Sequence, residues 1–412
     1  MRVAVLLEDR CKPNSNAYTY LKKYSALCDM ECIQFKGDKC KILETACPVC
    51  FNRARHCPDN AVIVINLPEE LDSEMSHCYG ENSFRLFRLP APRLEQVVGI
   101  LGPNGMGKST AVNLLSGSIT PNLGDWSNQT PDWDDVITTF PRGELRDYLA
   151  LLSEEGVSIA VKPQYIDKLP KIFEGEVNEL LERVDDRGDI QKYSEALGIG
   201  HILSRKLESL SGGELQRVAL CATLLKEADV YFFDEPSSYL DIYERMRMVR
   251  IIQDLSAMGK RVLVVEHDLA ILDVLCDLLH VVYGERAAYG IFTPPRTTRT
   301  AINAYLDGYL PEENVRIRDK PIRFVRGRTR GEDIGLPILK WGDMEKKMGD
   351  FQLTTGQGEV RSAEVIGVVG PNATGKTTMV KMIAGELEPD QGWCTMEAEA
   401  VSYTHLRAHE TQ

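Results

Sequence analysis

Short apolar runs alternate with helical patterns through the middle of the chain, from about residue 75 to residue 292. The runs at 97–101, 230–233 and 262–265 are continuous and apolar, as strands buried on both faces of a sheet are. Strands that alternate with helices are typical of a mainly parallel sheet with helices packed on it. The pattern therefore predicts an α/β fold for this region.

The remaining runs divide the rest of the chain into further regions. Residues 1–8 read as a first strand, and residues 1–74 form a cysteine-rich segment. We predict a linker at 293–337, which begins with a Thr-Pro-Pro sequence, and a second unit at 338–401. The last residues, 402–412, lack apolar periodicity and look like a translated sequencing adaptor, so we expect them not to be native.

The second unit repeats the first. An aromatic residue precedes a glycine-rich loop in both, with Phe84 18 residues before Gly102 and Phe351 19 residues before Gly370. Internal repetition of this length indicates duplicated domains and not a solenoid.

Composition and charge restrict the class of protein. A chain of 412 residues can form two or three domains, each with its own core. No apolar stretch approaches 18 residues, so we expect a cytoplasmic protein that makes no membrane contact. The net charge of −13 means that any nucleic-acid contact needs a local basic patch. One basic run lies in the predicted linker, where a stretch of 15 residues contains Arg316, Arg318, Lys320, Arg323, Arg326, Arg328 and Arg330.

Cysteine is concentrated at the start of the chain. Seven of the eleven cysteines precede residue 58: Cys11, Cys28, Cys32, Cys40, Cys47, Cys50 and Cys57. In an intracellular protein such density favours metal or iron–sulfur ligation over disulfides. The other four are scattered, and we expect them to be small buried apolar residues.

Two loops fit the phosphate-binding pattern G-x-x-x-x-G-K-[ST]. The first comprises Gly102, Pro103, Asn104, Gly105, Met106, Gly107, Lys108, Ser109 and Thr110. The second comprises Gly370, Pro371, Asn372, Ala373, Thr374, Gly375, Lys376, Thr377 and Thr378. Apolar runs at 97–101 and 365–369 precede the loops, and helical patterns follow, so each loop has the strand and helix that the motif requires. Backbone N–H groups at such a helix start hold phosphate, the lysine contacts the β- and γ-phosphates, and the Ser109 or Thr377 hydroxyl contacts Mg²⁺.

Further motifs accompany only the first loop. The strand at 230–234 ends in Asp234 and Glu235, which suit Mg²⁺ binding through water and polarisation of an attacking water. A Ser-Gly-Gly segment containing Ser211 and Gly213 offers a hydroxyl and a glycine nest at a helix start.

These residues resemble the ATP-binding cassette family. The resemblance implies that Gln164 senses Mg²⁺ and the attacking water and that His267 contacts the γ-phosphate. Phe84 and Tyr79 are candidates for stacking on adenine, with core packing as the alternative. Cassettes of this family pair head to tail, so the Ser-Gly-Gly segment of one completes the site of the other.

Three further stretches resemble the ribosome-recycling subfamily E, the RNase L inhibitor family. They are a helix–loop–helix insertion at about 130–155, the acidic strand and the residues that follow it at 231–241, and a hinge-like stretch at 289–318. The resemblance implies an ATPase that splits ribosomes into subunits with ATP and Mg²⁺. It also implies contacts with the small subunit, ribosomal RNA and termination or initiation factors. The two cassettes would pair within one full-length protein.

The N-terminal segment departs from this family, whose ferredoxin-like domain holds two [4Fe–4S] clusters. In the family's register the ligands that remain are Cys11, Cys47, Cys50 and Cys57, while Asn16, Tyr20, Tyr24 and Arg53 occupy the other positions. Two normal clusters are therefore not expected. One zinc or rearranged cluster on Cys28, Cys32, Cys47 and Cys50, or a metal-free fold, remain alternatives.

The second loop lacks the motifs that follow the first: no glutamine loop, Ser-Gly-Gly segment, acidic strand or switch histidine follows Lys376. We therefore expect two half-built sites that bind nucleotide weakly and hydrolyse it poorly in this chain alone. Two other functions remain open. One is a paralogue that uses ATP only to regulate ribosome or factor binding, and the other is a transport-linked cassette subunit, disfavoured by the insertion and the hinge.

Overall fold

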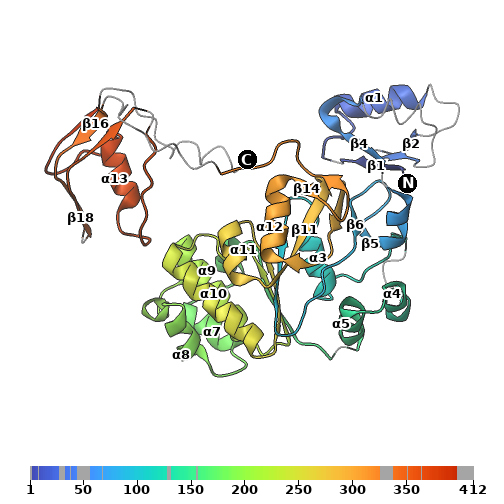
Figure 1. Cartoon of the computed structure of the whole chain (residues 1–412), viewed down its shortest axis with the longest axis horizontal. Coiled ribbons are helices and arrows are strands. Elements are labelled where there is room, and N and C mark those ends of the chain that lie inside the picture. Colours follow the sequence, from blue (N-terminus) through green and yellow to red (C-terminus); the bar gives the residue numbers. More distant parts are fainter. Residues whose placement is uncertain are drawn as a thin grey trace. The chain divides into compact units, whose positions relative to one another are not determined.

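A computed structural model describes residues 2–7, 9–26, 33–37, 39–43, 56–66, 68–127, 131–154, 156–324, 337–349, 351–362 and 364–396. The chain forms two compact units (Figure 1). The first comprises residues 1–239 and 247–322, and the second comprises residues 240–246 and 323–412.

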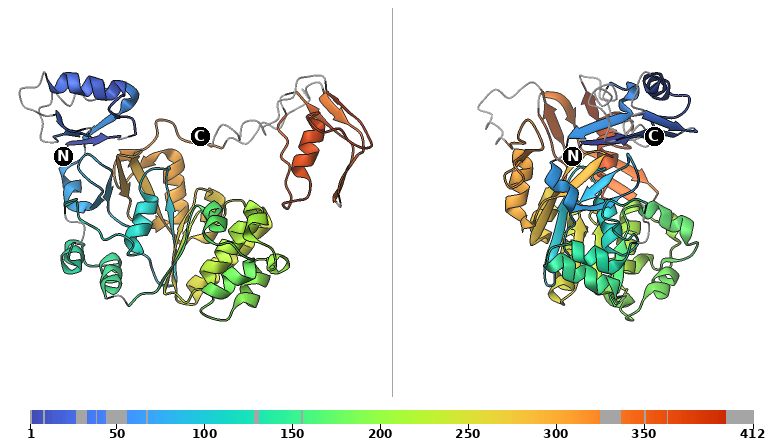
Figure 2. Two further views of the ribbon diagram at one scale, coloured as in Figure 1. Left: turned by 180° about the vertical axis from the view of Figure 1, so that it is seen from behind. Right: turned by 90° about the vertical axis from the view of Figure 1, so that its right-hand side faces the viewer.

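The N-terminal segment of the first unit is a small α+β fold. β1 (Arg2–Leu6) pairs antiparallel with β4 (Val62–Asn66), and β2 (Ile33–Lys36) pairs with β3 (Lys39–Ile42). Helix α1 (Asn16–Ser25) lies along these strands (Figure 2). The helix starts after Ser15, whose Oγ accepts a hydrogen bond from the backbone N–H of Tyr18 at 3.1 Å. The predicted first strand is thus confirmed.

Asn82, in the loop between β5 (Met75–Cys78) and β6 (Arg85–Phe87) of the main sheet, joins that sheet to this segment. Its amide Nδ2 donates to the carbonyl oxygens of Ala4 and Ile42 at 3.0 and 2.8 Å, and its Oδ1 accepts from the Ile42 N–H at 2.8 Å. The side chain is buried, and the backbone has a φ of 57°. Asparagine tolerates this left-handed conformation better than most residues, so one side chain satisfies both the turn and three buried polar groups.

We expect Asn82→Ala to lower the free energy of unfolding of the first unit by about 2–4 kcal/mol, because it leaves buried backbone groups without partners. Urea unfolding of the chain measures this loss. Asn60→Ala is the matched control, since Asn60 has a similar φ of 47° but is exposed. Equal losses in the two variants would show that backbone strain, and not the buried hydrogen bonds, accounts for the effect.

The main sheet of the first unit has nine strands in the order β5-β6-β12-β11-β7-β10-β9-β8, with β13 beside β11. The strands are β5 (Met75–Cys78), β6 (Arg85–Phe87), β7 (Val97–Leu101), β8 (Ile159–Lys162), β9 (Val230–Asp234), β10 (Arg261–Val265), β11 (Leu278–Glu285), β12 (Tyr289–Phe292) and β13 (Arg296–Thr297). β11, β7, β10, β9 and β8 run parallel, so their carboxyl ends share one edge. The α/β prediction is confirmed.

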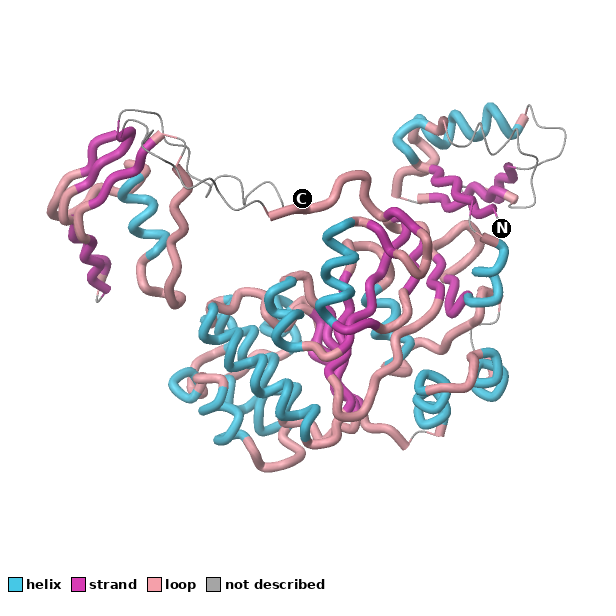
Figure 3. Tube along the Cα trace, viewed as in Figure 1, coloured by secondary structure: helices cyan, strands magenta, loops and turns pink. Residues whose placement is uncertain are grey.

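Helices lie around this sheet (Figure 3). They are α3 (Lys108–Leu115), α4 (Trp133–Thr139), α5 (Glu144–Ser153), α6 (Leu169–Ile172), α7 (Val177–Val184), α8 (Ile190–Ala196), α9 (Gly212–Leu224), α10 (Ile242–Ala257), α11 (Leu269–Leu275) and α12 (Thr298–Asp307). Short 3₁₀ turns are η1 (Pro58–Asn60), η2 (Glu69–Glu74), η3 (Ile166–Lys168), η4 (Gly200–Ile202) and η5 (Leu207–Ser209). The buried Tyr148 ties the α4–α5 pair to the core, where its hydroxyl donates to the Leu115 carbonyl at 2.5 Å.

The predicted linker contains ordered elements. Helix α12 buries Thr298 and Ala301, and β14 (Tyr309–Leu310) pairs with β15 (Val315–Arg316). Two ion pairs hold the turn between these strands: Arg88 to Glu313 at 2.6 Å and Arg296 to Glu312 at 2.7 Å. Residues 293–322 therefore belong to the first unit and not to a free connector.

The second unit holds a partial repeat. Its elements are β16 (Pro337–Trp341), β17 (Met344–Met348), β18 (Phe351–Thr355), β19 (Gly358–Arg361), α13 (Lys376–Ile383) and β20 (Cys394–Met396). β16 pairs with β19 and β20, and β17 pairs with β18, all antiparallel.

The strand predicted at 365–369 is not formed, so that prediction is wrong. The corresponding β7 of the first unit is buried and hydrogen-bonded between β10 and β11. In the second unit Val365 is 98% exposed and Val369 86% exposed. A strand needs partners for its backbone groups, and the described residues 337–396 supply none for this run.

This difference predicts contrasting hydrogen exchange. Backbone amides of 365–369 should exchange at nearly unprotected rates in this chain, whereas those of β7 should be strongly protected. Exchange followed by mass spectrometry compares the two peptides within one sample. Protection of 365–369 equal to that of β7 would contradict the exposed-strand description.

Candidate functional site

A cavity of about 450 Å³ lies where the first glycine loop follows β7 and where β9 ends. Its lining residues are Tyr79, Phe84, Asn104, Gly105, Gly107, Lys108, Ser109, Thr110, Gln164, Tyr165, Asp234, Glu235 and Arg286. All residues of the first loop except Gly102, Pro103 and Met106 therefore line one space, together with the predicted glutamine and both carboxylates.

The glycine loop turns tightly into α3. Gly107 has a φ of 86°, and a Cβ there would lie 2.7 Å from Cζ of Phe84, so only glycine fits. The Lys108 ammonium donates to the carbonyl oxygens of Gly102 at 2.7 Å and Pro103 at 3.0 Å. Burial lowers the pKa of Lys108 to about 8, although the carboxylates of Glu235 and Asp234 oppose the shift. At neutral pH the lysine remains a cation at the mouth of the loop.

The two carboxylates differ in environment. Asp234 ends β9, and its Oδ2 lies 3.5 Å from the Ser109 hydroxyl, so the two expected Mg²⁺ residues are adjacent. Burial, and then the neighbouring Glu235 charge, raises the pKa of Asp234. A hydrogen bond with His267 is the largest effect on Glu235 and lowers its pKa. Glu235 is therefore kept in the anionic form that a general base requires. A divalent cation bound beside Asp234 would stabilise the charged form of its carboxylate.

Gln164 and His267 both reach Glu235. Gln164 Nε2 donates to Glu235 Oε1 at 2.8 Å, and His267 Nε2 lies 3.5 Å from the same oxygen. His267 Nε2 is also 3.2 Å from the Lys108 ammonium. Gln164, His267 and Glu235, which sequence reasoning placed in catalysis, thus meet at one Glu235 oxygen beside the loop lysine.

Two buried residues that sequence reasoning missed hold the acidic turn. Glu235 has a φ of 48°, a strained conformation for this residue. Lys162 is fully buried, and its ammonium donates to the carbonyl oxygens of Asp234 at 2.9 Å and Glu235 at 3.2 Å. Gln216 Nε2 donates to the carbonyls of Glu235 and Pro236 at 2.9 and 2.8 Å. These bonds fix the backbone from which the Glu235 side chain projects.

The two aromatic candidates line the same cavity in different ways. Tyr79 is 51% exposed, and its hydroxyl donates to Thr110 Oγ1 at 3.2 Å. The His77 ring supports it edge-on, with centroids 4.8 Å apart. Phe84 packs beneath Gly107 instead. Tyr79 is therefore the more accessible surface for an adenine ring.

Ser211 and Gly213 do not line this cavity in the described part of the chain. Ser211 caps α9: its Oγ accepts from the Glu214 N–H, and Glu214 Oε2 accepts from the Ser211 N–H at 2.8 Å. The first glycine loop and the Ser-Gly-Gly segment thus belong to different surfaces of the same unit.

The second glycine loop reproduces the geometry of the first. Gly375 has a φ of 89°, and a Cβ there would lie 2.9 Å from Cζ of Phe351. Lys376 donates to the Gly370 carbonyl at 2.7 Å, as Lys108 does to Gly102. Asn372 lies within this loop, and Thr377 and Thr378 lie in the first turn of α13. Phe351, Gly370 and Gly375 therefore hold the positions that Phe84, Gly102 and Gly107 hold in the first unit.

The described cysteines of the N-terminal segment lie in an apolar core. Cys11 and Cys57 are buried beside Tyr18 and Leu21, and Cys40 packs against them. Burial raises the pKa of Cys57 to about 11 and that of Cys40 to about 12, so both are neutral thiols at neutral pH in this core.

The other cysteines proposed as ligands, Cys28, Cys32, Cys47 and Cys50, lie outside the described residues. Within the described residues no group of three or more metal-ligating side chains gathers. The Tyr20 and Tyr24 rings, at two of the family's ligand positions, contact each other with centroids 4.5 Å apart. Of the four cysteines in the family's ligand register, the structure thus describes Cys11 and Cys57, which share one core with Cys40.

A phosphate-binding loop, an acidic strand end and a switch histidine around one cavity of an α/β sheet define a nucleotide-binding domain of the ATP-binding cassette class. A family model described as "ABC transporter" matches residues 93–238 and 353–412. The chain belongs to the RNase L inhibitor family of ATP-binding cassette ATPases, as the following comparisons show.

Two curated relatives align with nearly the whole chain. An uncharacterized ABC transporter ATP-binding protein of Methanocaldococcus jannaschii is 42% identical, over 98% of this chain and 67% of its own length. Translation initiation factor RLI1 of Saccharomyces cerevisiae is 38% identical, over 95% of this chain and 66% of its own length. The chain thus spans about two thirds of the length of these relatives.

Solved structures give the same result. The chain is similar to a structure titled a model of ribosome-bound archaeal Pelota and ABCE1, with a TM-score of 0.88 and 46% identity over 95% of this chain and 66% of that one. A complex of the archaeal ribosomal stalk protein aP1 with the archaeal ribosome recycling factor aABCE1 matches with a TM-score of 0.74 and 48% identity, over 79% of this chain and 62% of that one. Among the helices that the structure describes, none combines the length and apolar character of a membrane span.

Proposed function

We propose that this chain, together with the rest of a second cassette, is a cytoplasmic ATPase that separates ribosomal subunits. The observation that carries the proposal is the meeting of Lys108, Asp234 and Glu235 in one cavity of a chain whose structural relative is ribosome-bound. The coupling of ATP to ribosome splitting rests on the family relationship.

The described residues suggest how the first site would act. Lys108 and the backbone N–H groups of the first loop would hold the β- and γ-phosphates of ATP. Mg²⁺, held by Ser109, Asp234 and Gln164, would neutralise charge on those phosphates. Glu235 Oε would accept a proton from the attacking water, with Gln164 and His267 keeping its carboxylate in place.

Head-to-tail pairing would complete this chemistry. Because Ser211 and Gly213 lie away from the first cavity, a Ser-Gly-Gly segment from a second cassette must close over ATP held by Lys108. Conversely, Ser211 and Gly213 would close over ATP on Lys376, where Thr377 contacts Mg²⁺. Nucleotide would then hold the two cassettes together, and hydrolysis would release them.

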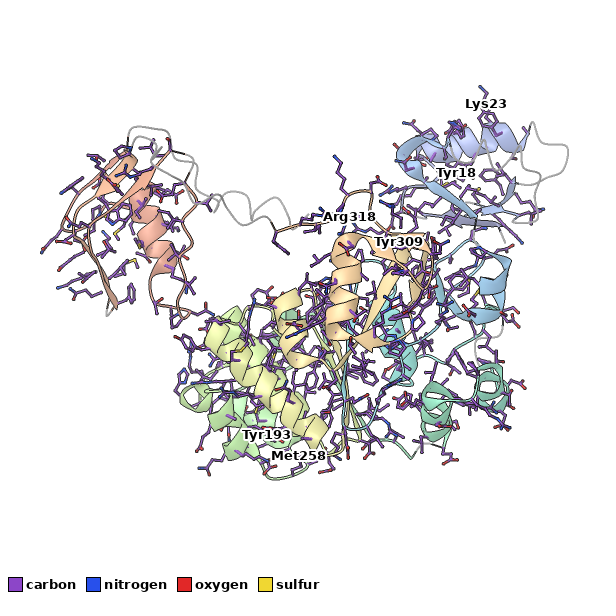
Figure 4. All side chains as sticks on the ribbon, viewed as in Figure 1. Tyr18, Lys23, Tyr193, Met258, Tyr309 and Arg318 are labelled. Atoms are coloured by element: carbon purple, nitrogen blue, oxygen red, sulfur yellow. The ribbon has the colours of Figure 1, made fainter. Side chains whose placement is uncertain are left out.

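Contacts with the ribosome would use the α4–α5 insertion and the hinge. Of the predicted basic run, Arg318 (labelled in Figure 4) already makes contacts within the first unit, because its guanidinium donates to the Tyr305 carbonyl at 3.1 Å and lies over the Tyr305 ring. Arg316 also donates to a carbonyl, that of Asp319 at 3.4 Å, but this contact is exposed, so Arg316 would be available to ribosomal RNA with Lys320 and Arg323. Arg326, Arg328 and Arg330 lie outside the described residues. Termination or initiation factors would be further partners.

Light scattering of purified ribosomes tests the proposal. The protein with a completed second cassette should lower the scattering of assembled ribosomes in the presence of ATP and termination factors, and Lys108→Ala should not. Unchanged scattering with the unmodified protein, under conditions in which it binds ATP, would refute subunit splitting.

An ATP-regulated binding paralogue is the second candidate. The replacement of four ligand positions of the family's register, by Asn16, Tyr20, Tyr24 and Arg53, favours it, because it would leave cluster-dependent splitting without its cofactor. Iron analysis beside the scattering assay separates the two functions. Ribosome binding without splitting, in iron-free protein, would support this candidate, whereas splitting by iron-free protein would show that the clusters are not needed.

A further inference from the structure

The turn between β11 and β12 forms a wall of the nucleotide cavity that none of the sequence motifs includes. The Ala287 N–H at this turn donates to the Gly105 carbonyl at 3.0 Å. A Cβ on Gly290, in β12, would lie 2.0 Å from the Met106 carbonyl oxygen. The β11–β12 hairpin thus packs directly against the first glycine loop at Gly105 and Met106.

Arg286 is the side chain that this turn places in the cavity. Its Cγ lies 2.8 Å from where a Cβ of Gly105 would be, so the side chain crosses directly over this glycine. Within the described part of the chain, the Arg286 guanidinium makes no hydrogen bond or ion pair. By contrast, the arginines that hold the hinge, Arg88 and Arg296, each bind a carboxylate. Arg286 therefore presents an uncompensated positive charge to the site.

The position of Arg286 distinguishes phosphate from base. The two aromatic candidates for adenine contact other loop residues: Tyr79 contacts Thr110, and Phe84 packs under Gly107. Arg286 instead lies over Gly105, in the part of the loop whose backbone holds the polyphosphate. A guanidinium has a planar set of donors that matches phosphate oxygens, which makes it well suited to this place.

We propose that Arg286 is a second cation, beside Lys108, for the polyphosphate of the nucleotide bound at the first glycine loop. The proposal rests on the proposed function in requiring that this loop binds nucleotide. It adds a recognition residue that comes from the sheet hairpin and not from the loop itself.

Equilibrium binding of fluorescent MgATP and MgADP analogues to this chain tests the proposal. Arg286→Ala and Arg286→Gln should each weaken MgATP binding about tenfold, the effect of losing one exposed charge-assisted contact. Arg286→Lys should keep most of the affinity because it keeps the charge. Glu285→Gln, on the same turn, is the matched control and should change affinity less than twofold.

Three outcomes would overturn the proposal. Affinity within twofold of the unmodified chain in both Arg286→Ala and Arg286→Gln would show that the cation makes no contact. Loss in Arg286→Ala but full affinity in Arg286→Gln would show that packing over Gly105, and not charge, matters. Equal loss in Arg286→Lys and Arg286→Ala would exclude a charge contact and favour stacking on the base.

Lys108→Ala separates this proposal from the proposed function. If Lys108→Ala abolishes binding while the Arg286 variants do not weaken it, only the role of Arg286 fails. If Lys108→Ala binds MgATP as the unmodified chain does, the nucleotide site itself is wrong. Circular dichroism of each variant confirms that the measured change is not a loss of fold.

Discussion

Glu235→Gln is expected to stop ATP hydrolysis while the nucleotide stays bound. In a protein that contains the completed second cassette, turnover should fall at least about 100-fold, the range for loss of a general base. An amide cannot take the proton from water, but it preserves the size of the side chain that Gln164 and His267 contact. Phosphate release measures turnover, and filter retention of labelled ATP measures the trapped nucleotide.

A second Glu→Gln variant, at a carboxylate outside the site, serves as the control for this result. Glu174→Gln removes one exposed carboxylate outside the cavity and should leave turnover unchanged. If Glu235→Gln hydrolyses ATP at the unmodified rate, Glu235 is not the base, and His267, which shares its surroundings, would be the next residue to replace.

Gly290→Ala is expected to disrupt the nucleotide site by displacing the first glycine loop at Met106. The added methyl group would lie 2.0 Å from the Met106 carbonyl oxygen, so either β12 or the glycine loop must move. Backbone displacement of this kind costs about 1–3 kcal/mol, and more where neither side can yield. β12 also pairs with β6 and β11, and the loop is fixed by α3. We therefore expect the free energy of unfolding to fall by an amount at the upper end of this range.

Thermal unfolding and MgATP binding should both report this loss. Gly200→Ala is the matched control, because a Cβ at Gly200 meets no atom within 4 Å and the residue has no left-handed φ. Unfolding of Gly290→Ala at the same temperature as Gly200→Ala, with unchanged nucleotide affinity, would show that the hairpin does not press on the loop as described.

Much of the first site could be predicted from sequence because its parts are local. The glycine loop, the acidic strand end and the residues after β10 each lie at the end of a buried parallel strand, and parallel strands bring such ends to one edge. Gln164 follows from the same rule, since it comes just after β8.

The supporting residues could not be found in this way. Lys162 contacts carbonyl groups 72 and 73 residues away, and Arg286 reaches Gly105 from the β11–β12 turn, which is distant in sequence although β11 pairs with β7. A lysine in an apolar strand or an arginine in a turn has no local pattern that marks its partner. Helix α12 lies within the stretch predicted as a linker from its Thr-Pro-Pro start, because that local sequence does not show that Ala301 is buried.

The run at 365–369 shows the opposite limit. Its sequence is as apolar as that of β7, yet it forms no strand, because strand formation depends on neighbours that may come from distant sequence. The glycine loop that follows still forms, since its turn and helix start are local.

The central claim is that the first cassette carries a complete catalytic set but needs a second cassette to close over its ATP. Steady-state ATP turnover by this chain alone, compared with the protein extended by the rest of the second cassette, tests it most directly. We predict that both bind MgATP and that the extended protein turns it over at least about 100-fold faster. Equal turnover by the two proteins would contradict the claim.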